Sequence, residues 1–458
     1  MQKILAIAWL TWKAAIRFRL FLVIAGLLLA TVVGLPLLLK DDGTARGFTQ
    51  ILITYTLSVI TALLGLSTLW LSCGTLARDI EECQIQVVAT KPVARWQIWL
   101  GKWLGIVSLN AVLLALSGAC VYGLLQWRAT RLPAAEQGVL RTEVLVARGM
   151  AQPPDYNAEI DARTEQLLQE RLKQTQISGA DLVQARQQLR EQVKAVYQLV
   201  PPQYSREWQI DLGLAKNFLR GKPLQLRVKF NAAQGSESGT YLGMWQVGVP
   251  GTANVWRSDP MSLAANTFHE FEIPPDLFDQ KGVLTIGFLN VNNTTLLFPL
   301  EDGMEVLYPS GGFTMNFARG LAILFCWMAL LAAIGLASAS FLSFPVASFF
   351  SLALLVVVFS SGTMANVVST GTTGMGDAGS GTSLADRVLI PLFKGILPII
   401  ELVKNFSPID SLSSGRAIAW SELAAAFGQI VLLFGGIIGL AGIGLFARRE
   451  LATAQGNQ

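Results

Sequence analysis

The fold is decided by residues 51–73, ILITYTLSVITALLGLSTLWLSC, a run of 23 residues that contains no charged side chain. An α-helix rises 1.5 Å per residue, so about 20 mostly apolar residues cross the hydrocarbon core of a bilayer, which is about 30 Å thick. Six segments of the chain meet this test: residues 20–39, 51–73, 103–127, 317–341, 346–368 and 423–446. The sequence therefore predicts an α-helical membrane protein with six transmembrane helices.

The distribution of charge divides the chain into three regions. Only 14% of all residues are charged, whereas soluble domains have about 25%. Residues 128–315 nevertheless carry 38 of the 66 Asp, Glu, Lys and Arg side chains. We therefore expect spans one to three in residues 1–127, a water-soluble insert in residues 128–315, and spans four to six in residues 316–458.

The basic residues predict the orientation, because cytoplasmic flanks of spans are rich in Lys and Arg. With six spans and a cytoplasmic N-terminus, the inner side receives Lys3, Lys13, Arg17, Arg19, Arg78, Lys91, Arg95, Lys102, Arg448 and Arg449. Both termini are then cytoplasmic, and residues 128–315 are extracytoplasmic. A seventh apolar stretch, residues 388–403, is 16 residues long and contains two prolines, so we expect a re-entrant or interfacial helix there.

The residues before the first span have the pattern of an amphipathic helix. Leu5, Trp9, Trp12 and Ile16 recur at helical spacing and fall opposite cationic side chains. Aromatic and cationic residues in this arrangement are typical of a helix that lies in the membrane interface. We expect such a helix on the inner surface.

The insert is predicted to be an α+β domain. Residues 157–175 and 180–199 have helical periodicity and are separated by a Ser-Gly pair, which favours a helical hairpin within residues 128–200. The expected apolar stripes of the two helices consist of Ile160, Leu167, Leu168 and Leu172, and of Leu182, Leu189, Val193 and Val196. Residues 201–315 contain short runs that alternate with period two, such as residues 224–230, and turn clusters between them. These runs predict an antiparallel β-sandwich.

Sequence motifs for catalysis and cofactor binding are missing. The chain has no G-x-x-x-x-G-K-[ST] motif, so we expect no nucleotide site of its own and no catalytic residues. His269 is the sole histidine and has no clustered ligand partners, which favours a structural role and no metal site. The glycine-rich residues 371–381 precede no phosphate-binding helix and are interpreted as an outer loop. The net charge of +4 follows from the placement of inner cations, so we expect no binding to nucleic acid.

The segment between the second and third spans, residues 74–102, is the only substantial inner loop. It is predicted to form a short acidic helix, a break at a proline, and a basic aromatic entry into the next span. Such a loop can dock a cytosolic partner or can be a solvated connector, and the residue pattern alone does not choose between them. The candidate docking residues are Arg78, Asp79, Glu81, Glu82, Gln84, Lys91 and Arg95.

The loop also carries a family resemblance. Residues 81–103, EECQIQVVATKPVARWQIWLGKW, resemble the coupling-helix region of type-2 ABC export permeases. Residues 342–347 (LSFPVA), 397–410 and 446–450 (FARRE) are similar to later parts of the same family, and the N-terminal helix is similar to its elbow helix. The resemblance covers the membrane segments, about 270 residues. It implies a permease subunit in a bacterial cell (inner) membrane that pairs with a second permease subunit, as a homodimer or heterodimer, and with two cytosolic ATPase subunits, which bind ATP and Mg²⁺ in its place.

The insert leaves three functions open. The first is export of an unidentified substrate; the second is mechanical transmission of ATP hydrolysis to envelope proteins without transport. The third is a membrane-anchored binding module with Tyr241, Trp245 and Trp256 as a ligand face, of which at least one is expected in the core.

The sixth span contains Gly435, Gly439 and Gly442, whose spacing allows a close helix contact. We favour packing within the chain over a subunit interface.

Overall fold

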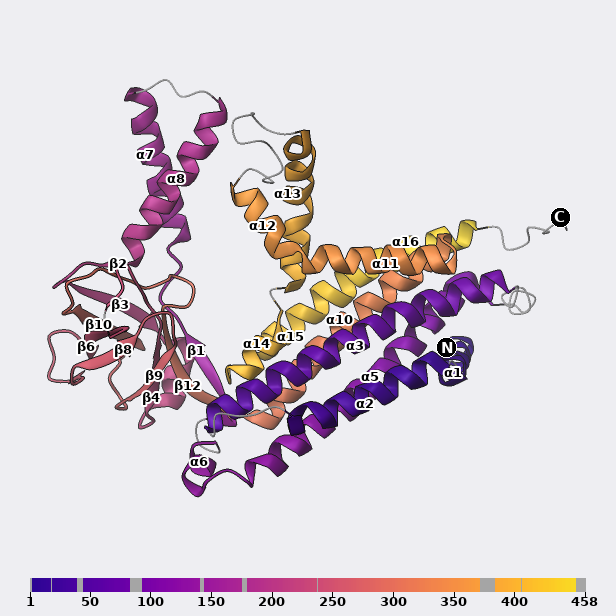
Figure 1. Ribbon diagram of the computed structural model, residues 1–458, viewed down its shortest axis with the longest axis horizontal. Helices are drawn as coiled ribbons and strands as arrows, with labels where there is room; N and C mark the ends of the chain where they lie inside the picture. Colours follow the sequence, from indigo (N-terminus) through magenta and orange to yellow (C-terminus); the bar gives the residue numbers. More distant parts are fainter. Residues whose placement is uncertain are drawn as a thin grey trace. The chain divides into compact units, whose positions relative to one another are not determined.

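The computed structural model describes residues 2–17, 19–38, 44–82, 93–140, 144–174, 179–236, 238–370, 384–404 and 406–449. The chain divides into two compact units (Figure 1). The helical unit comprises residues 1–147 and 311–458, and the β unit comprises residues 148–310.

Four helices of the described helical unit are long and apolar enough to cross a membrane: residues 47–81, 95–129, 313–341 and 420–448. They correspond to α3 (Ala45–Glu81), α5 (Arg95–Ala129), α10 (Phe313–Phe341) and the continuous run of α15 (Trp420–Ala426), η3 (Phe427–Gly435) and α16 (Gly436–Arg448). The predicted spans at 51–73, 103–127, 317–341 and 423–446 are therefore confirmed as long apolar helices. The segment η3 has the wider π-helical winding.

The predicted span at 346–368 is not a single straight helix. It forms α11 (Phe344–Phe359) and α12 (Ser361–Thr370), which together pass the test for a membrane span but are bent by 54°. The bend falls at Ser360, Ser361 and Gly362, and sharp kinks occur where such small residues interrupt a helix. The structure thus supports four to five apolar spans within the residues that it describes.

Two further apolar segments are helical. The first predicted span, 20–39, coincides with α2 (Arg19–Leu38), whose described apolar section, Val23–Leu35, is shorter than a span. The short stretch 388–403 lies within α13 (Leu384–Lys404), which keeps both prolines inside the helix. Its exposed apolar residues, Val388, Leu392, Ile399 and Leu402, recur along one face of the helix.

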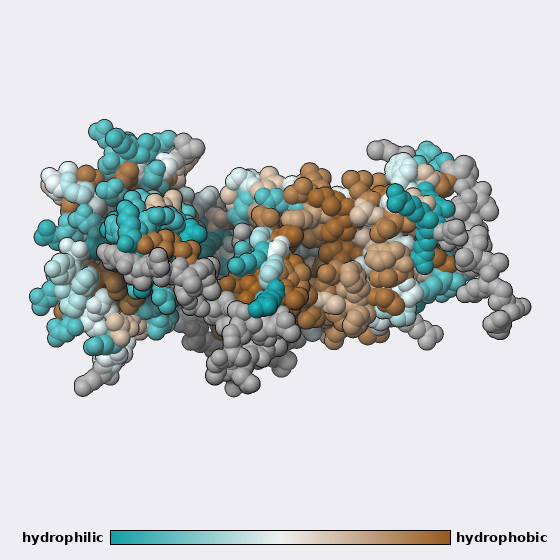
Figure 2. Space-filling view, turned by 90° about the horizontal axis from the view of Figure 1, so that it is seen from above, coloured by the Kyte–Doolittle hydropathy of each residue, from teal (hydrophilic) through white to brown (hydrophobic). Residues whose placement is uncertain are grey.

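The long helices pack through small residues. On α10, Gly335 lies so close to Ser72 of α3 that a Cβ atom would be 1.8 Å from the Ser72 Oγ. On α5, Gly101 contacts Ile7 and Gly105 contacts Thr11, so α1 (Gln2–Arg17) runs beside the first turns of α5. Figure 2 shows that hydrophobic residues dominate the surface of the helices, as expected for side chains in contact with lipid.

The helix α1 has a protein-facing side and an exposed apolar side. Ile7, Thr11 and Ala15 are buried, whereas Leu5 and Trp9 are exposed. Ile16 is exposed as well, which gives α1 the amphipathic pattern expected from its sequence. Trp12 differs from that expectation, because its indole N–H donates to the Ser108 hydroxyl of α5 over 2.8 Å.

The β unit contains the predicted helical hairpin, formed by α7 (Asn157–Gln174) and α8 (Gly179–Gln198). Leu168, Ala185 and Leu189 form its small apolar core. Exposed ion pairs link the two helices: Arg186 with Glu165 at 3.2 Å, and Arg190 with Asp161 at 2.8 Å. The predicted stripe was wrong at Val196, which is 70% exposed; at this end of α8 the next residue, Tyr197, makes the contact with α7 through Glu159.

The remainder of the β unit contains antiparallel sheets. The strand bounds are β1 (Val146–Ala151), β2 (Leu199–Val200), β3 (Ser205–Asp211), β4 (Leu224–Val228), β5 (Asn231–Ala232), β6 (Thr240–Gly248), β7 (Val255–Arg257), β8 (Met261–Ala264), β9 (His269–Ile273), β10 (Val283–Asn290), β11 (Leu296–Leu297) and β12 (Met304–Gly312). One sheet has the order β1-β12-β4-β9 and another has β3-β10-β6-β7, with β8 also paired to β6.

The two larger sheets enclose one apolar core, as predicted for a sandwich. Leu224, Leu226 and Val228 of β4 face Trp245 of β6 and Phe288 of β10, and all five are at most 2% exposed. A small third sheet, β2-β11-β5, lies beside them. The period-two alternation in the sequence therefore placed the inward-facing residues of β4 correctly.

Candidate functional site

Charged residues at one end of the helical unit connect the ends of α3, α5, α10, α11 and α16. We call these residues the helix-end cluster. Its members are Arg78, Asp79, Glu81, Arg95, Lys102 and Arg449. Two of them, Glu81 and Arg95, lie close in sequence to residues 83–92, which are outside the described part of the chain.

The first contact of the cluster joins α3 to α5. The Lys102 ammonium is 7% exposed and donates to the Asp79 carboxylate over 2.5 Å and to the Thr75 carbonyl over 2.7 Å. A buried ammonium without such partners would cost several kcal/mol, so removal of the carboxylate would destabilise the pair of helices. Asp79 therefore fixes the beginning of α5 against the end of α3.

The second contact joins α3 to α11. The Glu81 carboxylate accepts a hydrogen bond from the Phe344 backbone N–H over 2.8 Å. This N–H belongs to the first turn of α11, where backbone donors lack partners within the helix and a negative charge is favourable. The Arg78 guanidinium lies over the Phe344 ring at 4.4 Å and holds the same helix end.

The third contact closes the cluster through two arginines. Arg95 donates to the carbonyls of Phe446, Ala447 and Arg449, over 3.1, 2.6 and 2.9 Å, at the end of α16. Arg449 donates in turn to carbonyls at the end of α10, of which Ala339 is the nearest at 3.2 Å. Cations at helix C-termini satisfy carbonyls that have no partner within the helix.

These contacts give the candidate docking residues defined positions. Arg78, Asp79, Glu81 and Arg95 each hold a helix end within the chain, and Glu82 caps α3 through its backbone N–H while its side chain is exposed. Gln84 and Lys91 lie outside the described residues. The cluster therefore links the facing ends of α3 and α5 to the ends of α10, α11 and α16.

Two of the three candidate glycines make close contacts within the chain. A Cβ atom on Gly442 would lie 3.0 Å from Ala337 of α10, and one on Gly439 would lie 3.2 Å from the Trp99 ring of α5. Gly435 is buried but approaches only its own helix. The packing of α16 within the chain explains the spacing at Gly439 and Gly442.

The expected aromatic ligand face is wrong for two of its three residues. Trp245 is 1% exposed and Tyr241 is 5% exposed, and both belong to the sandwich core. Trp256 is half-buried and packs on the Phe271 ring at 6.4 Å. Residues on β6 alternate between core and solvent, and Tyr241 and Trp245 share the inner parity with Val247. They stabilise the fold and are not available to a ligand.

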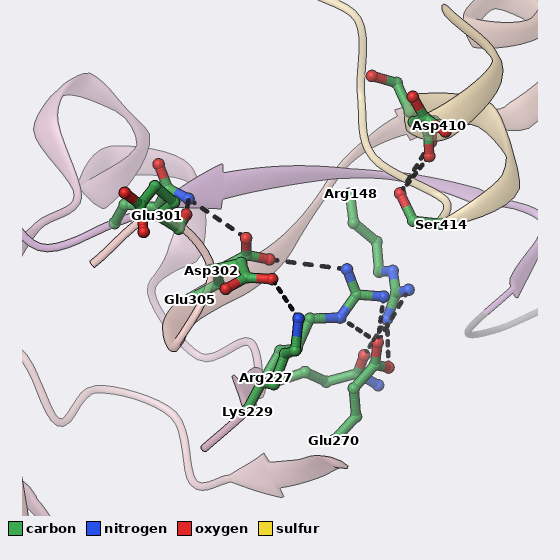
Figure 3. A network of polar contacts seen from close by, with 12 residues as sticks. Arg148, Arg227, Lys229, Glu270, Glu301, Asp302, Glu305, Asp410 and Ser414 are labelled. Atoms are coloured by element: carbon green, nitrogen blue, oxygen red, sulfur yellow. Dashed lines mark hydrogen bonds and ion pairs between the residues drawn. The ribbon is translucent and has the colours of Figure 1, made fainter. Parts of the chain in front are cut away.

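A buried ion network is the feature that the sequence did not reveal (Figure 3). It crosses the outer face of the four-stranded sheet: Glu305 of β12 lies opposite Arg227 of β4, which lies opposite Glu270 of β9. Arg227 bonds Glu270 over 2.7 Å, and Arg148 of β1 bonds the same carboxylate over 2.8 Å. Period-two alternation puts Arg227 on the side of β4 away from the core, but it does not show that this side is buried.

The sole histidine is held by the backbone of its own unit. His269 bonds the Ala264 carbonyl through Nε2 over 2.8 Å, which fits the structural role expected for it. Within the described ranges, no three His, Cys, Asp or Glu side chains gather in a way that could hold a metal ion.

In comparisons with known proteins, no family, no curated protein and no solved structure matches the chain.

Proposed function

We propose that the chain is the permease subunit of an ABC exporter, and that ATP hydrolysis by separate cytosolic subunits drives movement of a substrate across the membrane. In this proposal α2 completes six spans, and the helix-end cluster faces the cytosol. The basic side chains Arg78, Arg95, Arg448 and Arg449 at this end support the orientation, because Lys and Arg are enriched on cytoplasmic flanks. A second permease subunit and two ATPase subunits complete the assembly.

The observation that carries the proposal is the connectivity of the helix-end cluster. A partner that pushes the α3–α5 connection acts on α11 through Glu81 and on α16 through Arg95. From α16 the displacement reaches α10 through Arg449. A subunit that converts nucleotide hydrolysis into helix movement needs such a linkage, whereas a static membrane anchor does not.

The experiment is affinity purification of the full-length chain from its own membrane in mild detergent, followed by mass spectrometry of the proteins that remain bound. We expect a P-loop ATPase, and we expect Glu82→Lys to remove it, because this exposed side chain lies at the start of the connection. Glu401→Lys, the same change on an exposed carboxylate of α13, is the matched control. Purification without any ATPase would contradict the class, and an unchanged complex with Glu82→Lys would contradict the docking position.

A second function is favoured by one specific observation. Strand β12 ends at Gly312 and α10 begins at Phe313, so the last strand of the β unit continues directly into a membrane helix. The same strand carries Glu305 of the buried ion network. The chain is thus also suited to transmit movement of α10 to the β unit without transport. Solute flux into proteoliposomes separates the two functions, because the mechanical device hydrolyses ATP without flux.

A further inference from the structure

A loop of the β unit, which includes the short helical turns η2 (Gly213–Ala215) and α9 (Lys216–Leu219), combines an exposed aromatic ring with unpaired positive charge. Residues 213–223, GLAKNFLRGKP, contain three cationic side chains and no Asp or Glu. Phe218 is 74% exposed, more than any other aromatic side chain among the described residues of the unit, whereas the adjacent Leu219 is 1% exposed and anchors the loop in the core. Because Leu219 is buried in the core, the loop is anchored there, and the ring of Phe218 remains exposed.

Hydrogen bonds fix the shape of this loop. The Asp211 carboxylate accepts the Gly213 N–H over 2.8 Å, and the Asp276 carboxylate accepts the Gly221 N–H over 3.1 Å. The Lys216 ammonium donates to the carbonyls of Gln280 and Lys281, over 3.3 and 3.1 Å. The loop is thereby bound to its neighbour, residues 280–282, and the nearby carboxylates are engaged by backbone N–H groups.

Three cations of this loop and its neighbouring turn form no ion pair among the described residues. Arg220 and Lys222 follow Phe218 in the loop, and Lys281 is supplied by the neighbouring turn. All three side chains are exposed, and none forms an ion pair with any residue that the structure describes. The result is an exposed apolar ring on a segment that also carries exposed cations without ion-pair partners.

Sheet topology shows at which end of the β unit this loop lies. Strands β4 and β12 are antiparallel, with Leu307 opposite Gln225, so the C-terminal part of β12 lies beside the beginning of β4. The loop immediately precedes β4, and β12 continues in sequence into the apolar helix α10. The loop is therefore at the end of the sheet from which the chain continues into a membrane helix.

We propose that this loop binds the surface of the bilayer that holds the chain, with anionic phospholipid as its ligand. Phe218 enters the boundary between headgroups and acyl chains, and Arg220, Lys222 and Lys281 bind lipid phosphates. Exposed Phe side chains accompanied by Lys and Arg enter this boundary, and basic residues beside anionic lipid each strengthen binding by about fivefold. The centres of protein–protein interfaces are depleted of charge, so a single ring on a segment with unpaired cations fits lipid better than a protein partner.

The test is photo-crosslinking of the full-length chain in nanodiscs of phosphatidylcholine with or without phosphatidylglycerol. Benzoylphenylalanine replaces Phe218, and the control places it at Tyr204, a 66% exposed aromatic residue. Tyr204 lies just before β3, and the loop lies just after β3. The length of this seven-residue strand, about 23 Å, therefore separates Tyr204 from the loop. We expect the yield of lipid adducts to be several-fold higher at position 218 than at position 204. At position 218 the yield should also be higher in nanodiscs with phosphatidylglycerol than in nanodiscs without it.

Charge-reversed variants complete the test. Arg220→Glu, Lys222→Glu and Lys281→Glu should each lower the adduct yield in phosphatidylglycerol nanodiscs by about fivefold, and Lys173→Glu, an exposed cation on α7, should not. These side chains are exposed and unpaired, so the variants should fold and elute as the parent does. Equal adduct yields at 204 and 218, adducts only to protein at 218, or yields insensitive to the reversals would overturn the proposal. The proposal does not depend on ATP-driven export, since it concerns only the chain and its bilayer.

Discussion

Replacement of Arg95 by alanine tests the cluster at its most connected residue. The side chain donates three hydrogen bonds to carbonyls at the end of α16. A charged donor contributes about 1.5–3 kcal/mol per bond when buried, and a cation at a helix C-terminus contributes about 0.3–1 kcal/mol. Arg95 is only half-buried, so we expect a total loss of about 1.5 kcal/mol in the local stability of the last turn of α16.

Hydrogen exchange of residues 443–449 measures this loss directly. A change of about 1.4 kcal/mol in local opening corresponds to about tenfold faster exchange. Arg448→Ala is the control, because Arg448 is an exposed cation in the same turn and bonds no other described residue. If exchange rises equally in the two variants, or in neither, the capping role of Arg95 is refuted.

Three further predictions concern packing and charge. Glu270→Gln should destabilise the four-stranded sheet by about 3–5 kcal/mol, because its two arginine partners remain buried without the carboxylate charge. The loss should be measured as faster hydrogen exchange of β4. Glu272→Gln is the control, because Glu272 is exposed on the same strand, and it should have little effect. Gly442→Val should lower the melting temperature by overpacking against α10, at a cost of about 1–3 kcal/mol, while Gly444→Val, with open space around it, should not. A hydrogen bond from Lys194 of α8 lowers the pKa of the Glu301 carboxyl from 4.5. The stabilisation from this bond is fully present above pH 4.5 and is lost as the pH falls through the folded-state pKa. Hydrogen exchange of α8 should therefore become faster on acidification, and Glu301→Gln should remove the part of this change that comes from Glu301.

The elements that depend on short-range patterns were predictable from the sequence. Apolar runs of more than 20 residues located α3, α5, α10 and the α15–α16 run, because their length matches the bilayer. The change of period from 3.6 to two separated the helical hairpin from the sandwich. The bend after α11 was missed because apolar length alone does not distinguish a straight helix from a kinked one.

The contacts that define the candidate site could not be predicted in the same way. Arg95 meets Phe446 from 351 positions away, and Glu81 meets Phe344 from 263 positions away, so no local pattern relates them. The burial of Arg227 and Glu305, which lie opposite each other, could not be predicted, because alternation assigns the side of a strand and not its burial. Tyr241 and Trp245 could have been assigned to the core, since they share the parity of Val247.

We propose above that the α3–α5 connection receives a cytosolic ATPase. Benzoylphenylalanine at Ala94, the exposed residue that precedes α5, places a crosslinker at this connection in the full-length chain. Irradiation of intact membranes and mass spectrometry of the product then identify what lies against it. We predict an adduct with a P-loop ATPase subunit. An adduct only with lipid, or with no protein other than this chain, would contradict the proposed docking position.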